Sequence, residues 1–217
     1  MLDEFQFIYK QGSWYIGGFI GATACLAKWV DDQVKSWVGS IKLPSKAAKQ
    51  FPQTSFAALT CSLQTEWTYL QQVVPDVAPS FAPIEEVLAK SFLPALFGGK
   101  APPRNLTSLP VRFGGLGIPN PCTQASHHFD TSKEMTEGII ASLRENNELN
   151  TVVYRAHSSH LLRGRRHSQE VDLKNLLDPI LNASPKFEAR RINKRSQNTE
   201  CGSQPCLNCL WDCSFHG

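Results

Sequence analysis

Four cysteines and a histidine near the end of the chain combine the side chains and the spacing of metal ligands. Cys201, Cys206, Cys209 and Cys213 follow the pattern Cys-x4-Cys-x2-Cys-x3-Cys, and His216 lies three residues further on. Thiolates and imidazoles are the usual ligands of tetrahedral zinc. However, structural zinc sites usually have a longer spacer between their ligand pairs, and the first three cysteines also match an iron–sulfur loop. If this tail binds a metal, we expect zinc. The alternative is that its cysteines bind nothing. No cofactor is expected elsewhere in the chain.

Basic residues gather in two stretches of the last third of the chain. Residues 1–150 hold 12 Lys and Arg against 13 Asp and Glu, whereas residues 151–200 hold 10 against 5. Such clusters suit sequence-independent contact with the phosphates of RNA or DNA. Aromatic side chains that could stack on bases are scarce there, so a solvated basic stretch without a partner is the other interpretation. The predicted nucleic-acid-binding residues are Arg163, Arg165, Arg166, Arg190, Arg191 and Arg195.

Asp31 and Asp32 form the one acidic pair that could be compared with a catalytic centre. Two neighbouring carboxylates can help to hold the two Mg²⁺ ions of phosphoryl transfer. However, Trp29 and Val30 before them belong to an apolar helical stripe, which turns the two acids toward solvent. We therefore predict no catalytic residue in this chain.

Apolar residues at three-to-four spacing predict a series of helices. The first stripe runs from Leu26 to Ile41, and Pro44 is expected to end or restart that helix. A second helix should run from Pro52 to Val74 and a third from Pro83 to Gly98. Further helices are expected over residues 123–143 and 171–181, and a short β element over residues 14–21.

Prolines and glycines dominate the connection after the third predicted helix. Residues 100–121 also contain too many Leu, Val, Phe and Ile for a solvated linker, so we expect an ordered loop. The predicted fold is mainly α: a small helical bundle with a short N-terminal β element, this ordered Pro/Gly loop and a poorly ordered, basic, Cys-rich C-terminal tail. The expected divisions are residues 13–125, a continuing helix over 126–150, and a weakly ordered tail over 151–217.

Length and composition exclude several classes of protein. With 217 residues, 41% of them hydrophobic, and five tryptophans, the chain can form one core and is not wholly disordered. The start is acidic where a secretory signal is basic, and the uncharged run from Gly12 to Ala27 is shorter than a membrane span. We therefore expect an intracellular protein, in cytoplasm or nucleus, with no membrane role.

Three pieces of the sequence resemble the region that follows the palm in retrotransposon reverse transcriptases, which are RNA-directed DNA polymerases. Tyr15-Ile16-Gly17 is similar to the strand that ends the palm. Residues 52–76, from Pro-Gln through Trp-Thr-Tyr-Leu to Pro-Asp, are similar to a helix of the family. The most specific match is Leu109-Pro110-Val111-Arg112-Phe113-Gly114-Gly115-Leu116-Gly117, after Phe92-Leu93-Pro94-Ala95-Leu96. The three pieces cover about residues 13–125 in the order of the family.

This resemblance implies a thumb-like helical region without the catalytic half of the polymerase. In the family the catalytic aspartates precede the strand that Tyr15-Ile16-Gly17 resembles, whereas Asp31 and Asp32 follow it. The expected function is a catalytically incomplete fragment of a mobile element that keeps nonspecific contact with nucleic acid and packs against a palm-bearing polymerase segment. The alternative is a helical protein-interaction module with a zinc-binding C-terminal tail.

Overall fold

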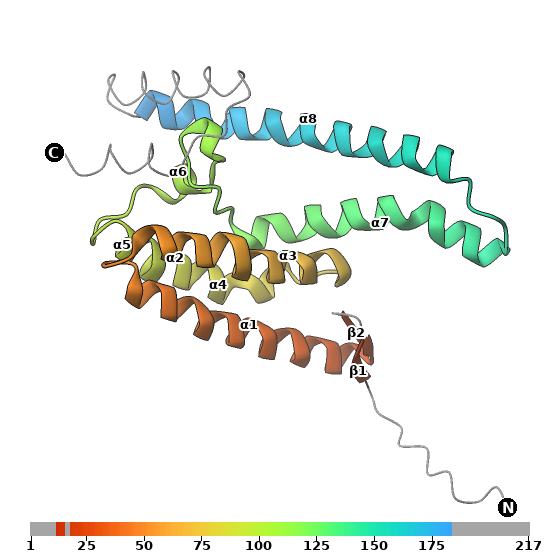
Figure 1. Cartoon of the computed structure of the whole chain (residues 1–217), viewed down its shortest axis with the longest axis horizontal. Helices are drawn as coiled ribbons and strands as arrows, with labels where there is room; N and C mark the ends of the chain where they lie inside the picture. Colours follow the sequence, from red (N-terminus) through yellow and green to blue (C-terminus); the bar gives the residue numbers. More distant parts are fainter. Residues whose placement is uncertain (1–11, 16–17, 184–217) are drawn as a thin grey trace, which may run out of the picture.

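Helices dominate the computed structural model, which describes residues 12–15 and 18–183 of the chain (Figure 1). A β-hairpin comes before the first helix and consists of β1 (Gly12–Tyr15) and β2 (Gly18–Gly21). The strands pair antiparallel, with Ser13 opposite Ile20. The predicted mainly α bundle with a small N-terminal β element is therefore confirmed.

Helix α1 (Thr23–Ala47) buries one apolar stripe against the other helices. Val30, Val34, Trp37 and Ile41 are its buried residues, as their spacing predicted. The helix does not end at Pro44 but continues to Ala47, so the predicted break at this proline is wrong. A proline removes only one backbone hydrogen bond, and the buried residues on either side of it, Ile41 and Ala48, hold the last turn against the core.

The second and third predicted helices are both present, and each contains a π-helical turn. The second consists of α2 (Pro52–Ala58), a π-helical turn (Leu59–Leu63) and α3 (Gln64–Val73). The third consists of a 3-10 turn (Ala78–Phe81), α4 (Ala82–Val87), a π-helical turn (Leu88–Phe92) and α5 (Leu93–Leu96). Gly98 and Gly99 follow with φ of +70° and +121°, which ends the helix as expected.

One apolar core joins α1 to these two composite helices. Its largest buried side chains include Trp37, Ile41, Leu59, Trp67, Phe81, Ile84, Leu88, Phe92 and Leu93. Helix α7 (Pro121–Glu145) packs its first turns on α3, where the buried Gln71 side chain donates a hydrogen bond of 2.9 Å to the carbonyl of Pro121. The bundle therefore holds the start of α7 in place.

The Pro/Gly connection is ordered, as predicted, and contains a short helix of its own. Helix α6 (Arg104–Ser108) is followed by a 3-10 turn (Val111–Phe113). Gly114 and Gly117 then take φ of +79° and +67°, which L side chains rarely adopt. The backbone N–H of Gly117 donates to the Leu109 carbonyl at 2.8 Å, so the connection folds back on itself.

The last described helix, α8, is much longer than the sequence analysis expected. It runs from Thr151 to Ala183, whereas we expected a helix only over residues 171–181 within a weakly ordered tail. The expected helix over residues 171–181 is therefore present, but it begins 20 residues earlier, so the expected weak order of residues 151–170 is wrong. Leu173, Leu177 and Leu181, at four-residue spacing, pack the predicted part of the helix against the Pro/Gly connection. The earlier part is joined to helix α7 by the ion pair of Arg165 with Glu134. The predicted poor order beyond residue 183 lies outside the described residues.

Candidate nucleic-acid interface

The first half of α8 is the most basic part of the described chain. Between residues 155 and 167 it contains four arginines and three histidines and no acidic residue. The second half contains Lys174 with Glu170, Asp172 and Asp178. Positive charge on this helix therefore lies toward its N-terminal end.

Three of the four arginines are open to solvent. Arg155, Arg163 and Arg166 are exposed, and no carboxylate of residues 12–15 and 18–183 lies within ion-pair distance of their guanidinium groups. His160 and His167, at three and four residues from Arg163, are exposed on the same side of the helix. These three arginines and two histidines form what we call the basic face of α8. Nε of Arg163 donates to the Ser159 carbonyl at 3.3 Å, and the remaining N–H groups of the three guanidinium groups can bind phosphates.

Arg165 has a different position from its neighbours. Its guanidinium forms an ion pair with Glu134 on α7, and both side chains are partly shielded from solvent. Of the three arginines predicted in this stretch, Arg163 and Arg166 thus lie on the basic face, whereas Arg165 turns toward α7. Arg165 ties the two helices together rather than offering its full charge to a partner.

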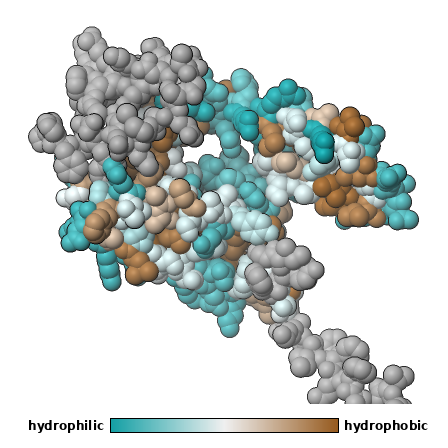
Figure 2. Space-filling model, viewed as in Figure 1, coloured by the Kyte–Doolittle hydropathy of each residue, from teal (hydrophilic) through white to brown (hydrophobic). Residues whose placement is uncertain are grey.

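Helices α7 and α8 form an antiparallel hairpin that extends away from the bundle (Figure 1). Helix α7 carries four acidic residues and two basic ones, so its net charge of −2 complements the basic half of α8. Apolar residues are exposed at the free end of this hairpin, where Figure 2 shows a hydrophobic surface. They are Ile140, Leu143, Val152 and Val153.

Arg104 fixes the connection that leads into this hairpin. Its guanidinium pairs with Glu85 on α4 and also donates to the carbonyls of Ile118 and Pro119, at 2.6 and 3.2 Å. Both members of the pair are largely buried, with side chains 20% and 19% exposed. The segment before α7 is therefore held to the bundle by charge and hydrogen bonds.

The same connection forms a second, small apolar cluster with α8. Leu109, Phe113 and Leu177 are its buried members. Gly115 is required inside this fold, because a Cβ atom there would lie 2.0 Å from the Leu109 carbonyl oxygen. The cluster therefore fixes the second half of α8 over the Pro/Gly connection, and through it the direction of the basic face.

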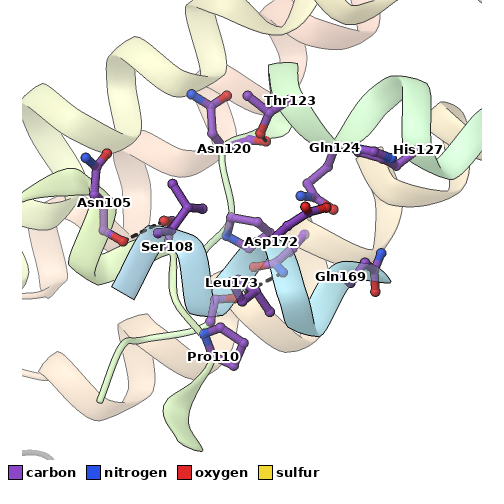
Figure 3. Close-up of a pocket in the computed structure, with 14 residues that line it drawn as sticks. Asn105, Ser108, Pro110, Asn120, Thr123, Gln124, His127, Gln169, Asp172 and Leu173 are labelled. Atoms are coloured by element: carbon purple, nitrogen blue, oxygen red, sulfur yellow. Dashed lines mark hydrogen bonds between the residues drawn. The ribbon is translucent and has the colours of Figure 1, made fainter. Parts of the chain in front are cut away.

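A cleft of about 540 Å³ lies between this connection, the start of α7 and the middle of α8 (Figure 3). Most of its lining residues are polar, although apolar atoms make up the larger part of the wall. The lining residues are Gln64, Asn105, Ser108, Pro110, Gly117, Pro119, Asn120, Thr123, Gln124, His127, Gln169, Asp172, Leu173 and Leu176. No role for these polar residues could be predicted from the sequence, because they come from four separate segments that only the fold brings together.

Two titratable side chains near the start of α7, His128 and Cys122, have shifted pKa values. Burial lowers the pKa of His128 from its usual value of 6.5, and the neighbouring His127 adds to this effect. Burial also raises the pKa of the Cys122 thiol, and the charge of Glu85 acts in the same direction. Both groups are therefore held in their neutral forms near the start of α7.

The acidic pair on α1 faces solvent, as its place beside the apolar stripe indicated. Asp31 and Asp32 are exposed, and Asp32 lies 3.6 Å from the ammonium group of Lys35. Within the described ranges, no three His, Cys, Asp or Glu side chains are grouped as metal ligands. Arg190, Arg191 and Arg195, and the predicted zinc ligands Cys201, Cys206, Cys209 and Cys213, lie outside the described residues.

Comparison of the chain with protein-family models, with curated proteins and with solved structures gave no match. In the described part of the chain, none of the helices combines the length and the apolar character needed to cross a bilayer. A function is therefore proposed below from the charge and geometry of the chain's own residues.

Proposed function

We propose that the protein is a thumb-like helical module that holds the sugar–phosphate backbone of a nucleic acid along the basic face of α8. The observation that carries this proposal is the set of three exposed arginines, Arg155, Arg163 and Arg166, without a carboxylate partner among the described residues. Unpaired guanidinium groups on a rigid helix can displace the counterions around phosphates, and this release drives binding.

The dimensions of α8 support backbone contact over several nucleotides. Residues 155 to 166 span about 16 Å of helix at about 1.5 Å per residue. At about 3.4 Å per nucleotide along one strand of a duplex, this length corresponds to roughly five phosphates. Contacts of this kind position a duplex without reading its sequence, so we propose nonspecific binding of RNA or DNA.

The proposed partner of this module is a palm-bearing polymerase segment of the retrotransposon reverse transcriptase type. The sequence resemblance supports this partner, as does a helical bundle that holds one basic helix away from its core (Figure 1). We do not propose strand synthesis by this chain, because Asp31 and Asp32 are exposed and Asp32 pairs with Lys35. The role proposed here is an intracellular one.

A charge-matched pair of variants tests the proposal. Arg163→Gln/Arg166→Gln removes two cations from the basic face, and Lys42→Gln/Lys46→Gln removes two exposed cations from α1. Fluorescence anisotropy with a labelled 20-base-pair RNA–DNA hybrid at low salt should show at least a roughly tenfold loss of affinity for the α8 variant. The α1 variant should stay within about twofold of wild type. Equal losses in the two variants would contradict a binding surface on α8.

The free end of the α7–α8 hairpin favours a second candidate function, a helical protein-interaction module with a zinc-binding tail. Leu143 and Val152 are 76% and 75% exposed there, and with the exposed Ile140 and Val153 they form an apolar surface of the kind that marks interaction sites. This candidate predicts association between copies of the chain at micromolar concentration, which Leu143→Glu abolishes and Arg163→Gln/Arg166→Gln leaves unchanged. Sedimentation velocity measures both effects.

A further inference from the structure

We infer that the cleft beside α8 accepts one unpaired nucleobase that carries an exocyclic amino group, such as cytosine. This inference rests on the proposed contact between α8 and a nucleic-acid backbone, and it adds a base-selective site to a surface that is otherwise nonspecific. Four observations carry it: the size of the cleft, its amide-rich walls, the carboxylate of Asp172 and the position of Arg166.

The cleft has the size and the wall chemistry for a flat heterocycle. Its volume of about 540 Å³ lies within the roughly 300–1,000 Å³ of small-molecule sites. Leu173 and Leu176 of α8 contribute apolar surface, and Pro110 and Pro119 do so from the Pro/Gly connection. Apolar groups of this kind can contact the faces of a base while polar groups read its edge.

Side-chain amides supply the hydrogen-bonding groups that a base edge needs. Gln64, Gln124 and Gln169 line the cleft from α3, α7 and α8 respectively. Gln64 donates from Nε2 to the Gly117 carbonyl at 3.4 Å, and its buried Oε1 atom has no hydrogen-bond partner. A buried acceptor without a partner is unfavourable, and turning this amide toward the cleft would let a ligand donor satisfy it.

Asp172 determines which chemical group enters the cleft. Its carboxylate lines the cleft and can only accept hydrogen bonds when ionised. It therefore repels a phosphate, but it accepts from an amino group such as the one at cytosine N4. Uracil presents a carbonyl oxygen at the same position, which a carboxylate repels. The cleft should consequently favour cytosine over uracil.

The basic face of α8 is placed to deliver a base to this cleft. Arg166 is exposed and lies three residues before Gln169, so the two side chains are neighbours on the helix surface. Arg166 therefore lies within one helical turn of Gln169 at the cleft, so a strand whose phosphate contacts Arg166 has its bases near the mouth of the cleft. Unpaired bases are commonly turned out of a strand into pockets of this kind.

Fluorescence anisotropy with 12-nucleotide oligocytidylate and oligouridylate RNA tests the selectivity. We expect wild type to bind the cytidine oligomer at least about fivefold more tightly, in line with one specific base contact. Asp172→Asn should reduce that ratio to near one. Asp178→Asn removes the same charge from an exposed position of α8 outside the cleft, and it should keep the wild-type ratio. Equal affinity of wild type for the two oligomers, or an unchanged ratio in Asp172→Asn, would overturn the inference.

Titration with the free nucleosides separates this inference from the proposed function. Millimolar cytidine should shift the side-chain amide signals of Gln64, Gln124 and Gln169 in ¹⁵N spectra of the full chain, and uridine should shift them much less. These shifts are expected even if neither oligomer binds, an outcome that would reject only the backbone contact. Absence of cytidine shifts in wild type would reject the base site, even if both oligomers bind with strong salt dependence.

Discussion

The guanidinium of Arg104 and the carboxylate of Glu85 meet through two parallel hydrogen bonds. Nε of Arg104 lies 2.7 Å from Oε1 of Glu85, and Nη2 lies 2.8 Å from Oε2. The pair joins α6 to α4, and the same guanidinium binds the carbonyls of Ile118 and Pro119 just before α7. This largely buried ion pair thus fixes the segment before the hairpin to the bundle, in addition to the packing of α7 on α3.

Removing one partner of this pair should be costly. Arg104→Ala leaves the largely buried Glu85 carboxylate without its partner, and we expect it to lower the free energy of unfolding by about 2–4 kcal/mol. Arg104→Lys keeps the charge but not the two-pronged geometry, so it should recover only part of the loss. Urea unfolding followed by circular dichroism measures both variants. A loss below about 0.5 kcal/mol in Arg104→Ala, which is typical of surface pairs, would contradict this role.

Gly115 should tolerate no side chain. In Gly115→Ala the new methyl group would lie 2.0 Å from the Leu109 carbonyl oxygen, so backbone must move. We expect a loss of about 2 kcal/mol or more, as in other overpacked sites. Gly164→Ala is the matched control, because no atom lies within 4 Å of the added methyl group, and alanine in α8 should stabilise the protein by about 0.5–1 kcal/mol. Thermal unfolding should show opposite shifts, and a destabilised Gly164→Ala would count against the continuous helix over residues 151–183.

The stability of the protein should depend on pH through His128. Burial lowers the pKa of this group in the folded chain below its usual value of 6.5. Below pH 6.5 the unfolded chain therefore binds more protons than the folded chain does, and protonation favours unfolding. The neutral imidazole of His128 therefore contributes fully to the free energy of unfolding above about pH 6.5. This contribution is lost as the pH falls through the lowered pKa of the folded chain.

Urea unfolding between pH 7.5 and pH 5.5 checks this dependence. His128→Gln has no titrating group at this position, so its free energy of unfolding should fall less steeply with decreasing pH than that of wild type. His127→Gln removes only the smaller of the two causes and should keep most of the slope. Parallel profiles for wild type and His128→Gln would show that this imidazole is not desolvated.

Much of the bundle could be predicted from the sequence because its helices follow simple apolar stripes. Val30, Val34, Trp37 and Ile41 repeat at three-to-four spacing, and all four are buried. The continuation of α1 past Pro44 could not be predicted from the apolar stripe, because it depends on the packing of neighbouring residues, which outweighs one lost hydrogen bond. The first half of α8 could not be predicted because it buries no apolar stripe: Val152, Val153 and Leu162 are all exposed.

The candidate site was predictable only where the residues themselves carry the signal. The basic stretch that contains Arg163 and Arg166 is visible in the sequence as a charge cluster. The pairing of Arg165 with Glu134 is not, because the two residues lie 31 positions apart. The cleft was also invisible, since Gln64 and Asp172 come together only after α8 packs over the connection.

The salt dependence of nucleic-acid binding tests the central proposal most directly. Affinity for a duplex, measured from 50 to 300 mM KCl, should give a plot of log K against log salt with a slope of about −3 or steeper, one unit for each unpaired arginine of α8. Arg163→Gln/Arg166→Gln should make that slope shallower by about two units, whereas Lys42→Gln/Lys46→Gln should leave it unchanged. A slope near zero in wild type, or the same slope in the α8 variant, would contradict phosphate binding along this helix.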